Sequence, residues 1–540
     1  MRSHLSRLSF AQAFRFLRNV LSPVVRTLGC VCCVLAGACV VADSTAAQAL
    51  KEERNEFTRS AGLAVDSRKQ LFLDHRFIAA SENIELTMNP PVKAGPAILP
   101  DREWETRELG FGCTVARDGE LYKMWYWSIT DNDVLTCLAV SKDGIHWDKP
   151  NLGIVEYEGS KNNNIVFKGT PNVFQANGFM FDEHAPQEHR YNLLIRHRGT
   201  GGRGLSIVTS KDGLTWSKPT FVLPFSVDTY NQFFWDRRIG KYVIFVRSWD
   251  PWRKVGRIET DDILKPWPYR RIDPMPGTSN VKVIDEAFAY DELDPIVSDH
   301  YNPAATVYED AQDAYFMFPT AFYHTQKGRP TPPPSLTDAR VAPPKSHMTG
   351  PMDIQMAVSR EGVRYHRPDR RPYVRLGVEG AIDSGSNYMA VGMVRSGDEL
   401  FQYYVGYEQP HGYHDLLGTQ HMNRWGAIIR TVQRVDGFVS ADASYSGGWL
   451  LTPPITFTGK RLELNVDTSA IGSAYVAIEE ADGKPVPNFT FEDCDLINGN
   501  FPHKIVTWKG NPDVSSLAGR PIRLRVKMRS TKLYAFQFLP

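Results

Sequence analysis

The feature that most constrains this chain is a ten-residue stretch that occurs three times. It spans Ser141–Pro150 and Ser210–Pro219, which share the pattern Ser-x-Asp-Gly-x-x-Trp, and a diverged copy spans Ser359–Pro368. The interval between the second and third copies is about twice the interval between the first and second. Self-similarity at a fixed period indicates that one structural unit is built several times along the chain.

A second repeated theme supports this interpretation. Aromatic-rich segments, each preceded by a polar turn, occur at Tyr122–Tyr126, Tyr191–Ile195, Tyr242–Val246, Tyr315–Phe318 and Phe401–Val405. Aromatic and β-branched runs bounded by Gly, Asp and Pro predict strands. Five such units predict a five-bladed β-propeller over residues 66–435. Within each blade the Asp-Gly pair should form a hairpin turn, and the Trp should pack between blades.

The pattern changes after Val435. From residue 436 to 540, short alternating strands with turns such as Asp482-Gly483 predict a C-terminal β-sandwich. The predicted fold class is therefore all-β, a five-bladed β-propeller followed by a C-terminal β-sandwich. Leu71–Ile78 is expected to be an early strand, and the Pro-rich segment Gly328–Gly350 is either an active-site rim or a solvated insertion.

The first 49 residues have the pattern of a secretory signal peptide. Basic residues precede an apolar run, Thr27–Ala42, which is short for a membrane span, and small residues follow at Ala47–Ala49. The alternative is an uncleaved anchor. Cleavage would leave a linker over residues 50–65 and a secreted or periplasmic protein with no membrane attachment.

The net charge bears on nucleic-acid binding, and the cysteine content bears on disulfide and zinc sites. The formal net charge is +1, so no electrostatic feature predicts a nucleic-acid partner. Four of the seven cysteines lie in the signal peptide. The remaining Cys113, Cys137 and Cys494 make neither a disulfide framework nor a zinc motif, and the first two should be buried thiols.

Several segments carry a resemblance to a known family: Tyr122–Tyr126, Ser141–Asn164, Gly240–Tyr242 and Leu533–Phe538. With these segments the chain resembles secreted bacterial glycosyl-hydrolase-like five-bladed propellers, related to glycoside hydrolase families 32, 43 and 68. The resemblance implies a carbohydrate substrate and hydrolysis of an O-glycosidic bond. The catalytic motifs of family 32 do not occur in this sequence, so candidate catalytic residues are assigned by position.

In a propeller the innermost strand of each blade lines the central channel. Carboxylates near the leading ends of the predicted inner strands are the catalytic candidates: Glu105, Glu108, Asp228, Asp299 and Asp383. Glycoside hydrolysis needs one protonated carboxylic acid and one ionised carboxylate. Crowding of like charges raises one pKa, which suits the acid. The alternative is that these side chains cap turns or pair with arginines.

Six further residues are candidates for substrate binding: Trp104, Arg196, Arg198, Arg247, Trp249 and His300. The arginines would bind an anionic sugar or pair with channel carboxylates. The tryptophans would stack on sugars or pack between blades. His300 would hold a carboxylate, bind a hydroxyl, coordinate a metal or serve a structural role.

The leading hypothesis is a secreted glycoside hydrolase acting on an extracellular oligo- or polysaccharide, with paired carboxylates at the channel mouth. The alternatives are a non-catalytic glycan-binding propeller and a sialidase-like enzyme, because the repeat resembles a shortened Asp box. No cofactor is predicted, although the oxygen-rich channel could hold a calcium ion. The sugar, the linkage and the oligomeric state stay open.

Overall fold

The structure is a computed structural model of the whole chain. It describes residues 62–169, 173–199, 202–225, 227–228, 230–249, 253–269, 284–295, 298–326, 329–330, 349–412 and 426–540. The predicted signal peptide and most of the Pro-rich segment lie outside these residues. Within them the fold is all-β, as predicted, with only short 3-10 turns between strands. No helix in this described part is long and apolar enough to cross a membrane.

Three four-stranded antiparallel sheets follow one another in the first half of the chain, and each is a meander in chain order. The first sheet contains β6 (Glu108–Asp118), β7 (Leu121–Ile129), β8 (Val134–Ser141) and β9 (Ile165–Lys168). The second contains β10 (Val173–Phe181), β11 (Tyr191–Gly199), β12 (Gly202–Ser210) and β13 (Thr220–Leu223). The third contains β14 (Gln232–Asp236), β15 (Lys241–Trp249), β16 (Arg253–Thr260) and β17 (Asp285–Phe288).

The next strands form an eight-stranded sheet and a three-stranded sheet. We describe them as two further groups, because a single residue pair, Met352 and Ser386, joins the two halves of the larger sheet. In the fourth group the strand pairing is interrupted, which gives two sets of three strands. One set contains β18 (Ser298–His300), β21 (Thr320–Tyr323) and β24 (Met352–Ile354). The other contains β19 (Ala305–Val307), β20 (Tyr315–Met317) and β25 (Ala357–Ser359). The fifth group contains β26 (Ser386–Met389), β27 (Val394–Ser396), β28 (Glu399–Tyr407), β29 (Gly426–Arg434) and β5 (Val92–Ile98). Because β5 pairs with β29, an N-terminal segment forms the edge of this last group.

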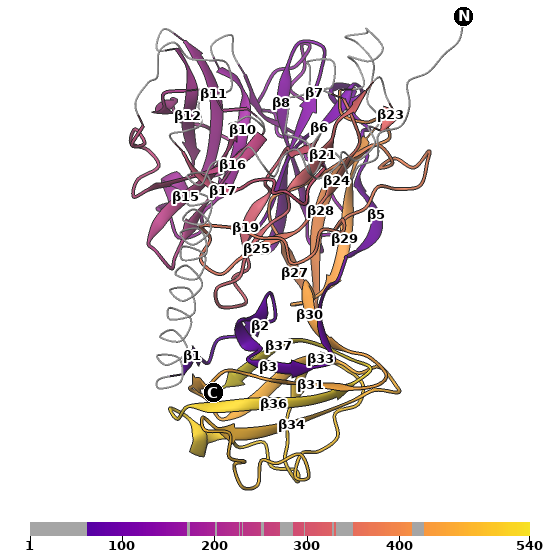
Figure 1. Cartoon of the computed structure of the whole chain (residues 1–540). Coiled ribbons are helices and arrows are strands. Elements are labelled where there is room, and N and C mark those ends of the chain that lie inside the picture. The colour runs from indigo at the N-terminus through magenta and orange to yellow at the C-terminus, as the bar shows by residue number, and fades with distance from the viewer. Residues whose placement is uncertain are drawn as a thin grey trace, which may run out of the picture.

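The C-terminal strands form two six-stranded sheets that lie at the opposite end of the molecule from β7 and β11 (Figure 1). One sheet contains β1 (Leu63–Asp66), β32 (Ile455–Phe457), β36 (Ile522–Arg529), β31 (Gly448–Leu451), β3 (Ala80–Glu82) and β34 (Ser473–Glu480). The other contains β35 (Asn500–Ile505), β33 (Arg461–Asp467), β37 (Thr531–Leu539), β30 (Val439–Ala443), β4 (Ile84–Met88) and β2 (Gln70–Leu71). Inward-facing apolar side chains of both sheets make one core.

This pairing differs from the sequence prediction for the N-terminal segment. The strands within residues 63–88 join the two C-terminal sheets, whereas the sequence placed everything after residue 66 with the repeated units. The predicted strand Leu71–Ile78 is also wrong in extent. Only β2 is strand, and a 3-10 turn at His75–Phe77 follows, because the Asp74 carboxylate accepts a hydrogen bond from the Arg76 backbone N–H.

The three repeated stretches form the predicted turns. The Ser141 hydroxyl accepts from the Gly144 N–H at 2.8 Å, and the Ser210 hydroxyl binds Gly213 in the same way at 2.9 Å. The glycine of each copy has a positive φ, between +70° and +75°, which explains why glycine is needed there.

The aromatic residue of each copy packs against a different strand group, as predicted. Trp216 Nε1 donates to the Val166 carbonyl of β9, and the Trp147 ring meets Tyr403 of β28 edge-on. Tyr365 of the diverged copy meets Phe245 of β15 in the same manner.

The strand groups also share a central cavity. A cavity of about 520 Å³ is bordered by residues of all five groups, including Val115, Phe181, Phe234, Val307 and Met393. Cys113, Cys137 and Cys494 are free, buried thiols, in agreement with the sequence analysis.

Candidate functional site

Tyr301 is the centre of a cluster to which all five strand groups contribute. It directly follows β18 and is half-buried. Its ring centroid lies 5.6 Å from Phe111 of β6 and 5.9 Å from Tyr388 of β26, both edge-on. His411, in the segment after β28, lies 4.6 Å away, and its Nδ1 is 2.7 Å from the Tyr388 hydroxyl. We call this group, with the charged residues described next, the Tyr301 cluster.

Two arginines from one hairpin approach the tyrosine. The guanidinium carbon of Arg247, in β15, lies 4.1 Å from the centre of the Tyr301 ring, and that of Arg253, in β16, lies 5.4 Å from it. Arg247 also donates from Nη2 to the Tyr301 carbonyl at 3.1 Å. Both arginines are buried, with 3% and 4% of their surface exposed. A guanidinium over an aromatic face is a favourable cation–π contact, and it fixes the orientation of both groups.

Asp228 joins the cluster through Arg247. Its Oδ2 accepts from Arg247 Nη1 at 2.6 Å, and its Oδ1 lies 3.8 Å from Arg196 Nη1 of β11. The Asp228 side chain is 33% exposed, whereas that of Arg247 is 1% exposed. The carboxylate is therefore held by the protein and is still partly exposed to solvent.

Asp299 lies on the other side of the tyrosine. It is bound by Arg253 at 2.7 Å, and His324 Nε2 lies 3.4 Å from its second oxygen. Burial alone would raise the pKa of Asp299, but the charges of Arg253 and His324 outweigh it and lower the pKa below its usual value. Asp299 is therefore an ionised, buried carboxylate.

The other predicted carboxylates are held elsewhere. Glu105 is fully buried and accepts from the Tyr126 hydroxyl and Lys149 Nζ, each at 2.6 Å. Asp383 accepts from Tyr404 at 2.7 Å and is paired with Lys93 at 2.5 Å. These partners belong to the first and fifth groups themselves. Glu108 begins β6, is half-buried and lies opposite Ile129.

Of the predicted binding residues, Arg196 and Arg247 are in the cluster, and Trp104 is not. Trp104 Nε1 donates to Asn164 Oδ1 at 3.1 Å, and its ring meets Tyr157 edge-on. Those contacts give it a packing role in the first sheet. The side chains of Arg198 and Trp249 lie outside the described part of the structure.

His300 points away from the Tyr301 cluster because neighbouring residues of a strand face opposite sides of the sheet. Its ring stacks on Tyr290 with centroids 3.9 Å apart and planes 3° apart. Burial, with the charges of Arg367 and Arg370, holds its pKa well below the usual value, so the imidazole is neutral. The stacked, neutral imidazole fits the structural role, which was one of the alternatives left open for His300.

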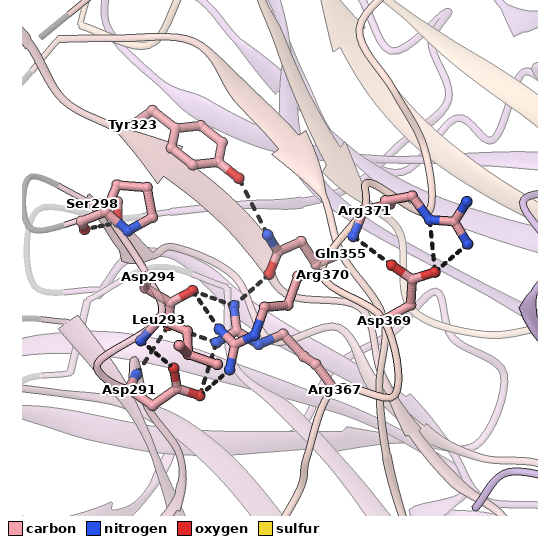
Figure 2. Close-up of polar contacts among 11 residues, drawn as sticks. Asp291, Leu293, Asp294, Ser298, Tyr323, Gln355, Arg367, Asp369, Arg370 and Arg371 are labelled. Carbon is pink, nitrogen blue, oxygen red and sulfur yellow. Dashed lines mark hydrogen bonds and ion pairs between the residues drawn. The ribbon is translucent and has the colours of Figure 1, made fainter. Parts of the chain in front are cut away.

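The face that His300 occupies carries a second charged network (Figure 2). Arg367 binds both carboxylate oxygens of Asp294, at 2.6 and 2.5 Å, and Arg370 bridges Asp294 and Asp291. Asp291 and Asp294 lie between β17 and β18, whereas Arg367 lies near the end of the diverged repeat and Arg370 just after it. Side chains far apart in the sequence thus join the third and fourth groups, which assigns this network to stability.

Sequence reasoning missed six members of the cluster: Phe111, Arg253, Tyr301, His324, Tyr388 and His411. Arg253 had a usable signal, because it starts its strand directly opposite Trp249, a predicted binding residue, in the hairpin. The five aromatic and imidazole side chains had none, since only the sheet arrangement brings them together. Among the described residues no group of three or more His, Cys, Asp or Glu side chains could hold a metal ion, and the calcium ion stays a prediction.

No protein-family model and no curated protein matches the chain. Solved structures with some likeness include a glycosyl hydrolase from Bacteroides ovatus, with 14% identity over 67% of this chain and 96% of that one, at a TM-score of 0.39. A thermostable family-43 glycoside hydrolase has 15% identity over 66% and 93%, at 0.35. An N-acetylgalactosamine deacetylase from F. plautii, in complex with blood group B trisaccharide, has 12% identity over 65% and 96%, at 0.39. At such TM-scores these likenesses decide neither substrate nor mechanism.

Proposed function

We propose that this protein is a secreted glycoside hydrolase whose active site is the Tyr301 cluster. The observation that carries the proposal is that Asp228 and Asp299, which come from different strand groups, flank one half-exposed tyrosine through Arg247 and Arg253. Glycoside hydrolysis needs an ionised carboxylate and a proton donor beside the sugar, and the cluster offers Asp228 for the first role and His411 for the second. The cavity bordered by five strand groups supports a five-bladed propeller, and the two C-terminal sheets support a β-sandwich that includes residues 63–88.

Within this site Asp228 is the reacting carboxylate. An ion pair with a guanidinium favours the ionised form, which serves as nucleophile or as base for water. Asp299 is buried, so its role is to hold Arg253 in place beside Tyr301. The proton for the leaving group comes from a group other than these two, and the imidazole of His411 is placed to supply it.

The arginines favour a sugar that carries a carboxylate or a sulfate. Arg196, Arg247 and Arg253 bring three positive charges to the cluster, against the two negative charges of Asp228 and Asp299. Guanidinium groups bind such anions with two parallel hydrogen bonds. The same ion pairing is also what a non-catalytic glycan-binding protein would use, so the experiment must separate binding from hydrolysis.

The test is release of reducing sugar from a panel of neutral, uronate-containing and sulfated polysaccharides. We expect hydrolysis of an acidic substrate by the wild type, and a loss of about 10²–10⁴-fold in Asp228→Asn, which removes the reacting charge. Asp398→Asn is the matched control, since Asp398 is exposed and outside the cluster. Full activity of Asp228→Asn would contradict the proposal. Binding of a glycan without hydrolysis, lost in Asp228→Asn, would favour the non-catalytic alternative.

A further inference from the structure

The outer face of one C-terminal sheet carries a row of side chains suited to a ligand. Along β36 the residues Ile522, Leu524, Val526 and Met528 are buried, so the alternating positions face outward. Lys527 lies directly opposite Trp449 of β31 on one side and Tyr475 of β34 on the other. Trp449, Lys527 and Tyr475 therefore form one row across three neighbouring strands.

This row lies in a depression of about 480 Å³. Its walls include Phe491, the hydroxyl-bearing Ser446 and Ser473, and the basic residues Arg525 and Arg529. Ligand pockets in proteins usually measure about 300–1,000 Å³, with aromatic walls and a few polar groups. The depression has that size and that composition.

The tryptophan in the row is held in place. Its Nε1 donates to Glu82 Oε2 at 3.0 Å, and the guanidinium of Arg525 lies 4.7 Å from its ring centre. Arg525 is in turn bound by Glu479 at 2.5 Å. An indole fixed by two neighbours offers a rigid surface, which loses little conformational entropy when a ligand binds.

The exposed charged residues of the depression are Lys527, Arg529 and Glu82, which together leave a net charge of +1. Arg525 is already paired with the carboxylate of Glu479. Tyr445, which is 65% exposed, lies beside Arg529 and extends the aromatic surface. Aromatic faces stack on the apolar faces of sugar rings, and exposed cations pair with carboxylate or sulfate groups.

We infer that this face, the Trp449 row with its basic neighbours, is a binding site for acidic polysaccharide. The inference does not depend on hydrolysis at the Tyr301 cluster, because the two sites lie on different sheets. The Tyr301 cluster is proposed to recognise the same class of carbohydrate. Binding of an acidic polymer at this face would therefore hold the protein on its proposed substrate.

Affinity electrophoresis of the full chain tests the inference. We expect the wild type to be retarded in gels that contain polygalacturonate or chondroitin sulfate, relative to a plain gel, and not in gels that contain dextran. The first polymer presents carboxylates and the second adds sulfates, so their comparison identifies the recognised anion. Added salt should reduce the retardation.

Two variants locate the site. Lys527→Gln and Trp449→Ala should each weaken retardation about threefold or more, whereas Lys142→Gln, an exposed lysine in the first sheet, should not. Because Lys527 is exposed, Lys527→Gln keeps the test decisive even if Trp449→Ala fails to fold. Unchanged retardation of Lys527→Gln, an equal loss in Lys142→Gln, or equal retardation by single-stranded RNA would overturn the inference. A loss in Asp228→Asn instead would place binding at the Tyr301 cluster and overturn it as well.

Discussion

Removal of Arg253 should destabilise the fold far more than removal of the lysine beside it. The Arg253 and Asp299 side chains are 4% and 2% exposed, and their ion pair measures 2.7 Å. Arg253→Met keeps most of the apolar stem but removes the guanidinium that pairs with the buried Asp299 carboxylate. Breaking a buried pair by removing one partner costs about 3–5 kcal/mol, because the remaining charge is uncompensated.

The pH dependence of this loss has a definite sign. In the wild type the pKa of Asp299 is lowered, so its stabilising contribution is present above the unfolded value, about 3.9, and is lost as the pH falls through the folded pKa. In Arg253→Met burial dominates and raises the folded pKa above the unfolded one. The variant should therefore regain stability as the pH falls from 7 to 5.

Equilibrium urea unfolding followed by tryptophan fluorescence at pH 7 and pH 5 measures both effects. Lys254→Met is the matched control, because Lys254 is the next residue and its pair with Glu286 is half-exposed, with side chains 26% and 41% exposed. That control should lose less than about 1 kcal/mol. A loss below about 1 kcal/mol in Arg253→Met, or the same loss at both pH values, would refute the reasoning.

Two further substitutions have expected outcomes. Burial raises the pKa of Asp353 to about 7, above its unfolded value, so Asp353 destabilises the protein above that pH and ceases to do so as the pH falls toward 4. Asp353→Asn should therefore raise the free energy of unfolding at pH 8 by on the order of 1–4 kcal/mol, with no gain at pH 4. A loss of stability at pH 8 would contradict this. Gly392 has φ +103°, and a Cβ there would lie 2.0 Å from the Val115 carbonyl oxygen. Gly392→Ala should therefore lower the free energy of unfolding by more than about 2 kcal/mol, measured by thermal or urea unfolding. The control Gly397→Ala should cost about 1 kcal/mol, because φ there is +62° and nothing lies within 4 Å of the added Cβ. Equal losses in the two variants would show that the contact with Val115 does not matter.

The position of the candidate site could be predicted only in part. Asp228 and Asp299 were both identified from their places before or within inner strands, and the structure brings both to Tyr301. Glu105 and Asp383 satisfied the same rule, yet each is bound by a lysine distant in the chain, Lys149 or Lys93. Ion-pair partners of this kind depend on which strands become neighbours, and no local pattern specifies that.

The sequence by itself determined the strands and the turns of this protein. The five repeated aromatic-rich runs all form strands, and the Ser141, Ser210 and Ser359 turns rest on hydrogen bonds within three residues. Only the tertiary structure decided that residues 63–88 join the C-terminal sheets, that Asp299 and His300 face opposite sides, and that Arg253 lies over Tyr301. The physical reason is distance along the chain: local hydrogen bonds need only neighbouring residues, whereas a site assembled from several strand groups needs the packing of the whole fold.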